Sequence, residues 1–96
     1  MKTVKVNQGP ADAQLIDVRE ADEYAEVHAA GATLIPLSEF AGRVGEIDTD
    51  RDIYLICRSG NRSGKACEFL KEHHGIEAIN VEGGTMAWVE KGLPLG

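Results

Sequence analysis

Basic residues are scarce in this sequence, and their scarcity limits the class of partner. The 96 residues include 10 Lys and Arg against 16 Asp and Glu, so the formal net charge is -6. General nucleic-acid binding requires a basic face, and we therefore expect no nucleic-acid partner. In so acidic a chain, any local group of arginines stands out.

Long apolar runs are also missing. No stretch approaches the roughly 20 residues that cross a bilayer, and Met1–Lys5 lacks the apolar segment of a signal peptide. We therefore expect no membrane partner and a cytoplasmic location. The length predicts a single domain over residues 1–96, with one modest core.

Cysteine occurs only twice, at Cys57 and Cys67. Two cysteines can form one disulfide at most, and in a reducing compartment a catalytic or buried role is favoured over a structural bridge. The histidine pair His73–His74 has no cysteine or acid at ligand spacing. We therefore expect no metal site and no organic cofactor.

Strand-like and helix-like patterns alternate along the chain, which predicts an α/β fold. The expected strands cover residues 3–6, 14–18, 32–35, 53–56 and 76–81, and the expected helices cover 20–27, 39–47, 63–74 and a last segment after residue 85. Residues 7–13 contain Gly-Pro and indicate a loop. Ser38, Ser63 and Thr85 are the expected N-caps, and Gly75 is the expected C-terminal cap of the third helix.

The stretch with the clearest chemistry begins where the apolar run Ile53–Ile56 ends at Cys57. The run predicts a buried strand of a parallel sheet, and open α/β sheets place ligands at the carboxyl ends of such strands. A loop with Arg58 and Arg62 follows, and a helix is expected to begin behind it. Backbone N–H groups in such a loop form an anion-binding nest, which together with the arginines favours a thiolate. The sequence therefore predicts a nucleophile and an anion site in one loop.

Three motifs in order carry a family resemblance. The loop Cys57–Ser63, an N-terminal stretch Leu15–Glu20 that continues through Tyr24 and His28 to Pro36, and a C-terminal stretch from Gly83–Gly84 through Trp88 to Pro94 resemble single-domain rhodaneses, the thiosulfate sulfurtransferases. The resemblance covers roughly residues 14–95. It implies a rhodanese-like fold, with a small, mostly parallel central sheet that has helices on both faces.

The resemblance also implies an activity and a site. Cys57 is the expected catalytic residue, and it would take a sulfane sulfur from thiosulfate or a similar donor as a persulfide. A thiol, including a thiol on a protein, or cyanide would accept the sulfur. The expected substrate-binding residues are the rest of the loop: Arg58, Ser59, Gly60, Asn61, Arg62 and Ser63.

Two other functions compete with this one. A persulfide carrier that docks a partner and turns over slowly would have the same loop. A rhodanese-fold phosphatase or arsenate reductase would have five residues between the cysteine and the arginine, whereas four residues separate Cys57 from Arg62. A smaller ring of N–H groups suits a persulfide better than a tetrahedral phosphate, so the phosphatase is the less favoured alternative.

Three residues outside the loop have both a chemical and a structural interpretation. Asp17 and Arg19 are either a catalytic pair or structural support, as an ion pair that holds the end of a strand near the loop, and structural support is favoured. Cys67 is either a resolving thiol for a persulfide on Cys57 or a small core residue beside Ala66, and the core interpretation is favoured.

Overall fold

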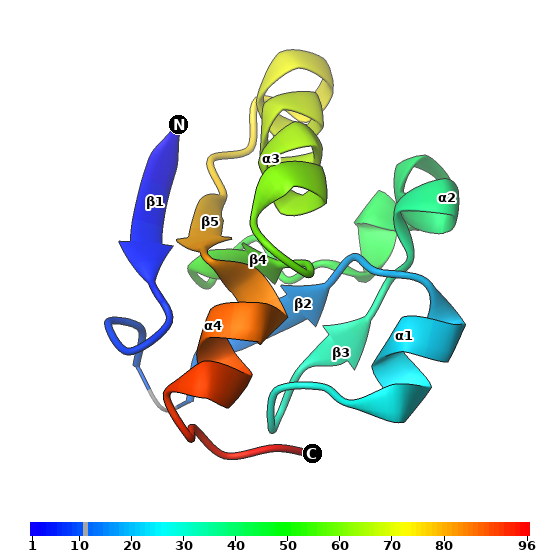
Figure 1. Ribbon diagram of the computed structural model, residues 1–96. Helices are drawn as coiled ribbons and strands as arrows, with labels where there is room; N and C mark the ends of the chain where they lie inside the picture. The colour runs from blue at the N-terminus through cyan, green and yellow to red at the C-terminus, as the bar shows by residue number, and fades with distance from the viewer. Residues whose placement is uncertain (11) are drawn as a thin grey trace.

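The computed structural model describes residues 1–10 and 12–96, in which five strands form one sheet. The strand order is β1-β5-β4-β2-β3, and the four pairings between neighbours are parallel (Figure 1). The strands are β1 (Lys2–Lys5), β2 (Gln14–Asp17), β3 (Thr33–Leu34), β4 (Ile53–Ile56) and β5 (Ile79–Glu82). The predicted α/β class and its parallel sheet are therefore confirmed.

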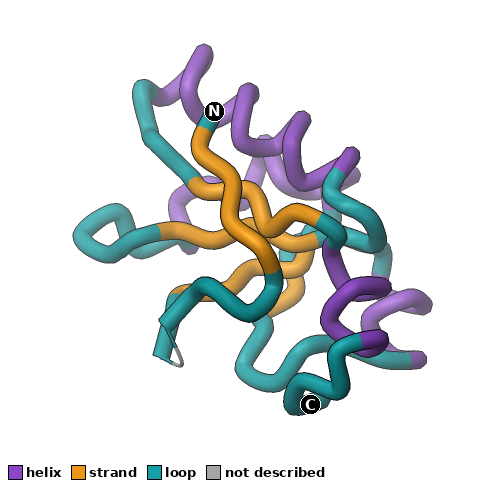
Figure 2. Tube along the Cα trace, turned by 60° about the vertical axis from the view of Figure 1, so that its left-hand side comes forward, coloured by secondary structure: helices purple, strands orange, loops and turns teal. Residues whose placement is uncertain are grey.

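Helices cover both faces of this sheet, as expected. They are α1 (Ala21–Glu26), α2 (Leu37–Phe40), α3 (Asn61–His74) and α4 (Gly84–Glu90), and a 3₁₀ helix η1 (Ala41–Glu46) follows α2. One apolar core includes side chains of α2 and α3, and a second core on the other face has Tyr24 of α1 and Trp88 of α4 packed against it. Figure 2 shows the strands gathered at the centre, with α3 running across one side.

The central strand β4 supplies both cores, because side chains alternate between the two faces of a sheet. Ile53 and Leu55 belong to the core under α3, whereas Tyr54 and Ile56 belong to the opposite core. Cys57 follows the same alternation and lies with Leu55 in the first core. The alternation therefore determines which face of the sheet receives the sulfur.

The C-terminal end of α3 is as expected, but the next strand begins later than predicted. Gly75 caps the helix with a φ of 65°, and the Ile76 N–H donates to the Leu70 carbonyl. This contact closes the helix end and leaves Ile76 packed against the first core. Because residues 76–78 connect the end of α3 to the sheet, β5 begins at Ile79 rather than at residue 76.

The helix expected over residues 39–47 begins two residues early and is irregular, as the two glycines within it predict. It divides into α2, which begins after Pro36, and the 3₁₀ helix η1, which contains Gly42 and Gly45. Glycine is a poor α-helix former, and this explains the irregular segment. Ser38 does not cap the helix, because it lies inside α2 and donates its hydroxyl to Glu20 instead.

Two further N-caps were predicted wrongly. The caps of α3 and α4 are Gly60 and Gly83, while Ser63 and Thr85 lie within the first turns. Each hydroxyl has turned toward Cys57: Ser63 contacts its sulfur and Thr85 donates to its carbonyl oxygen. The two residues expected to begin helices instead support the loop.

The N-terminal segment forms the sheet edge beside β5. Strand β1 covers residues 2–5 rather than 3–6, and a turn follows it, within the loop expected at 7–13; residue 11 lies outside the described residues. Within residues 1–10 and 12–96, no helix combines the length and apolar character that a membrane span requires.

Candidate active site

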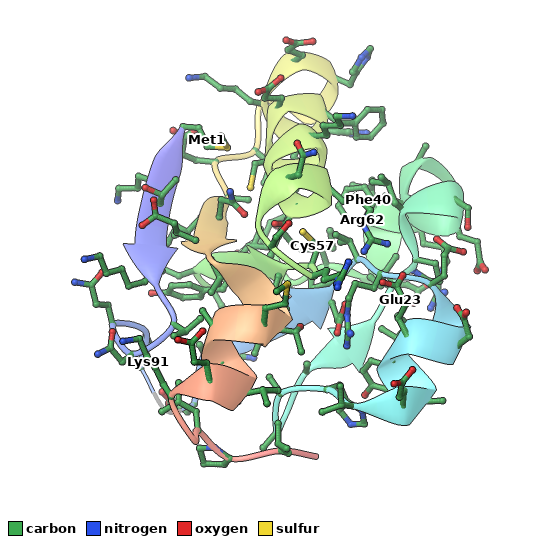
Figure 3. All side chains as sticks on the ribbon, in the orientation of Figure 1. Met1, Glu23, Phe40, Cys57, Arg62 and Lys91 are labelled. Carbon is green, nitrogen blue, oxygen red and sulfur yellow. The ribbon has the colours of Figure 1, made fainter. Side chains whose placement is uncertain are left out.

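The sulfur of Cys57 lies at the carboxyl end of β4, where two donors reach it. The side chain is 1% exposed. The Gly60 N–H donates to Sγ at 3.1 Å, and the Ser63 hydroxyl lies 3.3 Å from it. Both donors come from the expected loop, and Figure 3 shows Cys57 below the N-terminal end of α3.

The loop can reach the sulfur because Gly60 has a left-handed backbone. Its φ of 105° is a conformation that residues with a Cβ rarely adopt. This conformation turns the Gly60 N–H back toward Sγ and begins α3 at Asn61. The 14-residue helix α3 therefore presents its N-terminal end, which carries partial positive charge, to the sulfur.

These contacts determine the acidity of the thiol. Burial raises the pKa of Cys57, but the Ser63 hydroxyl and the backbone N–H groups of Ser63, Gly60 and Ser59 outweigh burial and lower the pKa below its ordinary value. Hydrogen bonds to the charged form are therefore the physical basis of an activated thiolate.

Helix α4 holds the loop from the other side of the sheet. The Thr85 N–H donates to the Cys57 carbonyl at 2.8 Å, and the Met86 N–H donates to the Arg58 carbonyl at 3.0 Å. The Thr85 hydroxyl also donates to the Cys57 carbonyl, at 3.0 Å. The first-turn N–H groups of α4, which have no partner inside the helix, are thus used to fix the backbone of the nucleophile.

The Arg62 side chain extends from the loop to helix α1, where it has a partner that the sequence did not indicate. It makes a bidentate ion pair with Glu23 of α1, at 2.7 and 2.8 Å. Hydrogen bonds from Arg62 lower the pKa of Glu23 to about 2, although burial opposes the shift. Glu23 also accepts the Glu20 N–H, so one carboxylate joins the start of α1 to the loop (Figure 3). From the sequence alone, Glu23 is only an acidic residue in the first turn of a helix, where negative charge is favoured.

Arg58 is exposed and lies beside a cleft of about 540 Å³ between α1 and α4. The cleft is lined by Arg19, Glu23, Glu26, Val27, Arg58, Thr85, Met86, Val89 and Glu90. Met86 and Val89 are 53% and 45% exposed, which gives one wall an apolar surface. An incoming anion at the loop would meet the guanidinium of Arg58 at the edge of this cleft.

Asp17 and Arg19 form a buried pair at the end of β2. The side chains are 0% and 4% exposed, and Arg19 Nη2 lies 2.8 Å from Asp17 Oδ2. Arg19 also donates to the carbonyl of Val27 at 2.6 Å, which links β2 to the end of α1. Because Asp17 pairs with Ile56 across the sheet, this ion pair lies one residue from Cys57.

The side chains of the remaining residues of interest have surroundings of their own. Ser59 and Asn61 are exposed, and Ser59 acts through its backbone N–H. Cys67 is a buried free thiol in the first core, and burial raises its pKa to about 11. His28 stacks on Tyr24 and contacts the Tyr24 carbonyl.

Asn80 is a functional candidate that sequence reasoning missed. It lies on β5 and contacts both Ser63 and the Gly60 carbonyl. A polar residue inside the apolar strand Ile79–Val81 is a signal that could have drawn attention to it, because a buried amide needs partners. Among the described residues, no group of three His, Cys, Asp or Glu side chains is placed to bind a metal ion.

Comparison with known proteins agrees with the fold described above. The profile of the rhodanese-like domain family matches residues 1–91. The crystal structure of a rhodanese-related protein from Thermoplasma volcanium superposes with a TM-score of 0.90 at 30% identity, over 100% of this chain and 98% of that one. The fold expected from the resemblance is therefore confirmed.

Two relatives carry names that refer to sulfur. A sulfurtransferase from Allochromatium vinosum is 37% identical over 84 residues, which are 88% of this chain and 78% of that protein. YrkF from Bacillus subtilis, whose name places it among sulfur carrier proteins, is 39% identical over 77 residues, which are 80% of this chain and 42% of that protein.

Proposed function

We propose, from the premise that this chain belongs to the rhodanese-like domain family, that it transfers sulfane sulfur through a persulfide on Cys57. Sulfur transfer as the reaction class is supported by the family and by the named sulfurtransferase relative. The observation that carries the assignment to Cys57 is the lowered pKa of a thiol that accepts the Gly60 N–H and faces the Ser63 hydroxyl.

The first half of the reaction loads the sulfur. The Cys57 thiolate attacks the outer sulfur of thiosulfate or a similar donor, a new sulfur–sulfur bond forms, and sulfite leaves with the electrons of the broken bond. Arg58 at the cleft edge supplies a positive charge for the incoming dianion. The loop N–H groups and the helix α3 N-terminus stabilise negative charge on the bound sulfur.

The second half regenerates the thiolate. An acceptor thiolate or cyanide attacks the outer sulfur of the persulfide, and the electrons of the broken bond return to Cys57. A cleft of about 540 Å³ is larger than thiosulfate requires, so its size supports an acceptor with more bulk, including a thiol on a protein. No cofactor enters either half.

Intact-protein mass spectrometry tests the proposal. Thiosulfate should add the mass of one sulfur atom to the protein, and cyanide should then remove it as thiocyanate. The Cys57→Ser protein is the control and should gain no mass. The proposal is wrong if the native protein gains no sulfur from thiosulfate or other sulfane donors, or if the added mass persists in the control.

A carrier with slow turnover is the second candidate, and the similarity to YrkF favours it specifically. Such a carrier would load one sulfur but discharge it slowly to cyanide. Comparing the single-turnover rate of loading with the rate of discharge separates the two functions. The four-residue spacing between Cys57 and Arg62 continues to disfavour a phosphatase.

The two loop arginines should have separable effects. Arg58→Ala should raise the KM for thiosulfate and lower kcat/KM by about ten- to a hundredfold, because a charge-assisted contact is lost. The melting temperature should stay unchanged, since the Arg58 side chain is exposed. Thiosulfate kinetics and thermal melts measure both quantities.

Arg62→Ala is the matched comparison. It removes a half-buried ion pair with Glu23, so it should cost about 1 kcal/mol of stability and lower the melting temperature by several degrees. A lower melting point for Arg58→Ala, with only a KM change for Arg62→Ala, would reverse the two roles.

A further inference from the structure

Asn80 holds two parts of the active-site loop at once. Its side chain is 7% exposed on β5. Nδ2 donates to the Gly60 carbonyl at 3.0 Å, and Oδ1 faces the Ser63 hydroxyl. A carbonyl can only accept, so the contact with Gly60 requires the amide nitrogen there and leaves the amide oxygen for Ser63.

The Ser63 hydroxyl has two possible acceptors but only one hydrogen to donate. Its hydroxyl is fully buried and lies within reach of both Asn80 Oδ1 and Cys57 Sγ. A hydroxyl has one hydrogen to donate. While Cys57 is a neutral thiol, its S–H can donate to Ser63, and Ser63 can donate to Asn80. When Cys57 ionises, the thiolate and the amide oxygen both require the same hydrogen.

We propose that Asn80 is a positioning residue for Cys57. The amide oxygen of Asn80 competes with the Cys57 sulfur for the single hydroxyl hydrogen of Ser63. In the thiol and in a persulfide, where the inner sulfur is uncharged, the hydrogen goes to Asn80. In the thiolate it turns to the sulfur, because hydrogen bonds to charged groups are the stronger ones. Asn80 thus stabilises the uncharged states of Sγ relative to the free thiolate. The persulfide part of this inference rests on the proposed function, whereas the thiol part does not.

The charged side chains near the loop either form ion pairs with one another or line the cleft. Arg62 of α3 pairs with Glu23 of α1, and Asp17 of β2 pairs with Arg19. Arg58 extends from the loop to the cleft. The side chains that β5 and α4 bring to the loop, Asn80 and Thr85, do not titrate. A change at Asn80 therefore acts on the thiol through Ser63 or through the loop backbone.

A double-mutant cycle separates these two routes. The parent protein carries Cys67→Ala, so that the pH dependence of alkylation by iodoacetamide reports Cys57 alone. Asn80→Leu should leave the hydroxyl hydrogen to the sulfur and lower the alkylation midpoint by about half to one pH unit. Ser63→Ala should raise the midpoint. In the Ser63→Ala background, Asn80→Leu should lose its lowering effect, because no hydroxyl remains to be released.

Asn80→Asp is a second, nearly isosteric variant for the case in which leucine prevents folding. The carboxylate keeps the hydroxyl hydrogen more firmly than the amide does, so the midpoint should rise. Ser63→Ala raises the midpoint in the parent but should leave it unchanged in the Asn80→Asp protein, since the hydroxyl there no longer serves the sulfur. Thermal melts confirm that each protein is folded.

The proposal is wrong if Asn80→Leu shifts the midpoint equally with and without Ser63, or if Ser63→Ala raises the midpoint as much in the Asn80→Asp protein as in the parent. Either result would mean that Asn80 acts only through the loop backbone. Alkylation needs no sulfur transfer, so a protein that fails to load sulfur from thiosulfate yet shows the expected cycle would refute the proposed function and the persulfide part, and it would leave the thiol part of this inference intact.

Discussion

Replacing Cys57 by serine should abolish sulfur transfer from thiosulfate, with a loss of more than about a thousandfold in kcat. A serine hydroxyl in the same nest does not ionise near neutral pH and cannot form a persulfide. The fold should persist, because the buried oxygen can still accept the Gly60 N–H. Thiocyanate production measures the loss, and circular dichroism checks the fold.

Cys67→Ala is the matched control for this variant. Cys67 is buried in the first core, and burial raises its pKa to about 11, so very little thiolate exists there at neutral pH. Its removal should leave most of the activity and cost some stability through lost packing. An equal loss of turnover in both variants would support a two-thiol mechanism with Cys67 as the resolving thiol.

Gly84→Ala should be the most damaging of the conservative glycine substitutions. Gly84 has a φ of 58°, and a Cβ there would lie 2.5 Å from the carbonyl oxygens of both Cys57 and Arg58. These carbonyls are fixed by α4 and cannot move without displacing the nucleophile. Backbone strain and the clash together should lower the free energy of unfolding by about 2 to 5 kcal/mol. Urea denaturation measures it.

Two other glycines allow strain and clash to be separated. Gly75 has a φ of 65° with nothing within 4 Å of a new Cβ, so Gly75→Ala should cost only the strain, about 1 to 2 kcal/mol. Gly42 has no positive φ and open space around it, so Gly42→Ala should be neutral or slightly stabilising. If Gly84→Ala costs no more than Gly75→Ala, the carbonyl contacts of α4 do not restrain the loop as we infer.

The contiguous part of the site could be predicted well. Cys57 to Ser63 are adjacent in the chain, and a buried strand followed by a glycine-containing loop and a helix has few ways to fold. The nest and the orientation of α3 follow from that order. The β4 alternation likewise follows from apolar side chains that must be buried on both faces of a parallel sheet.

The N-cap predictions at Ser63 and Thr85 failed for one shared physical reason. Ser and Thr hydroxyls can bond a local N–H or a distant partner with similar energy, so the sequence near them does not decide between the two. Ser63 and Thr85 both have distant partners once β4, β5 and α4 are packed together. Gly60 and Gly83, which have positive φ, are the N-caps of α3 and α4 instead.

By itself, the sequence determined the α/β class, the strand that carries Cys57 and the loop that surrounds the sulfur. These features depend on hydrophobic periodicity and on neighbours along the chain. Only the tertiary structure decided that Glu23 pairs with Arg62, that Asn80 shares the Ser63 hydroxyl and that α4 holds the Cys57 carbonyl. Glu23, Asn80 and Thr85 each lie more than fifteen residues in sequence from the loop residue that they contact. They belong to α1, β5 and α4, elements that bury apolar side chains in the second core. Short-range patterns cannot specify such partners, because hydrogen bonds and ion pairs form with whatever group the packing of the sheet places within reach.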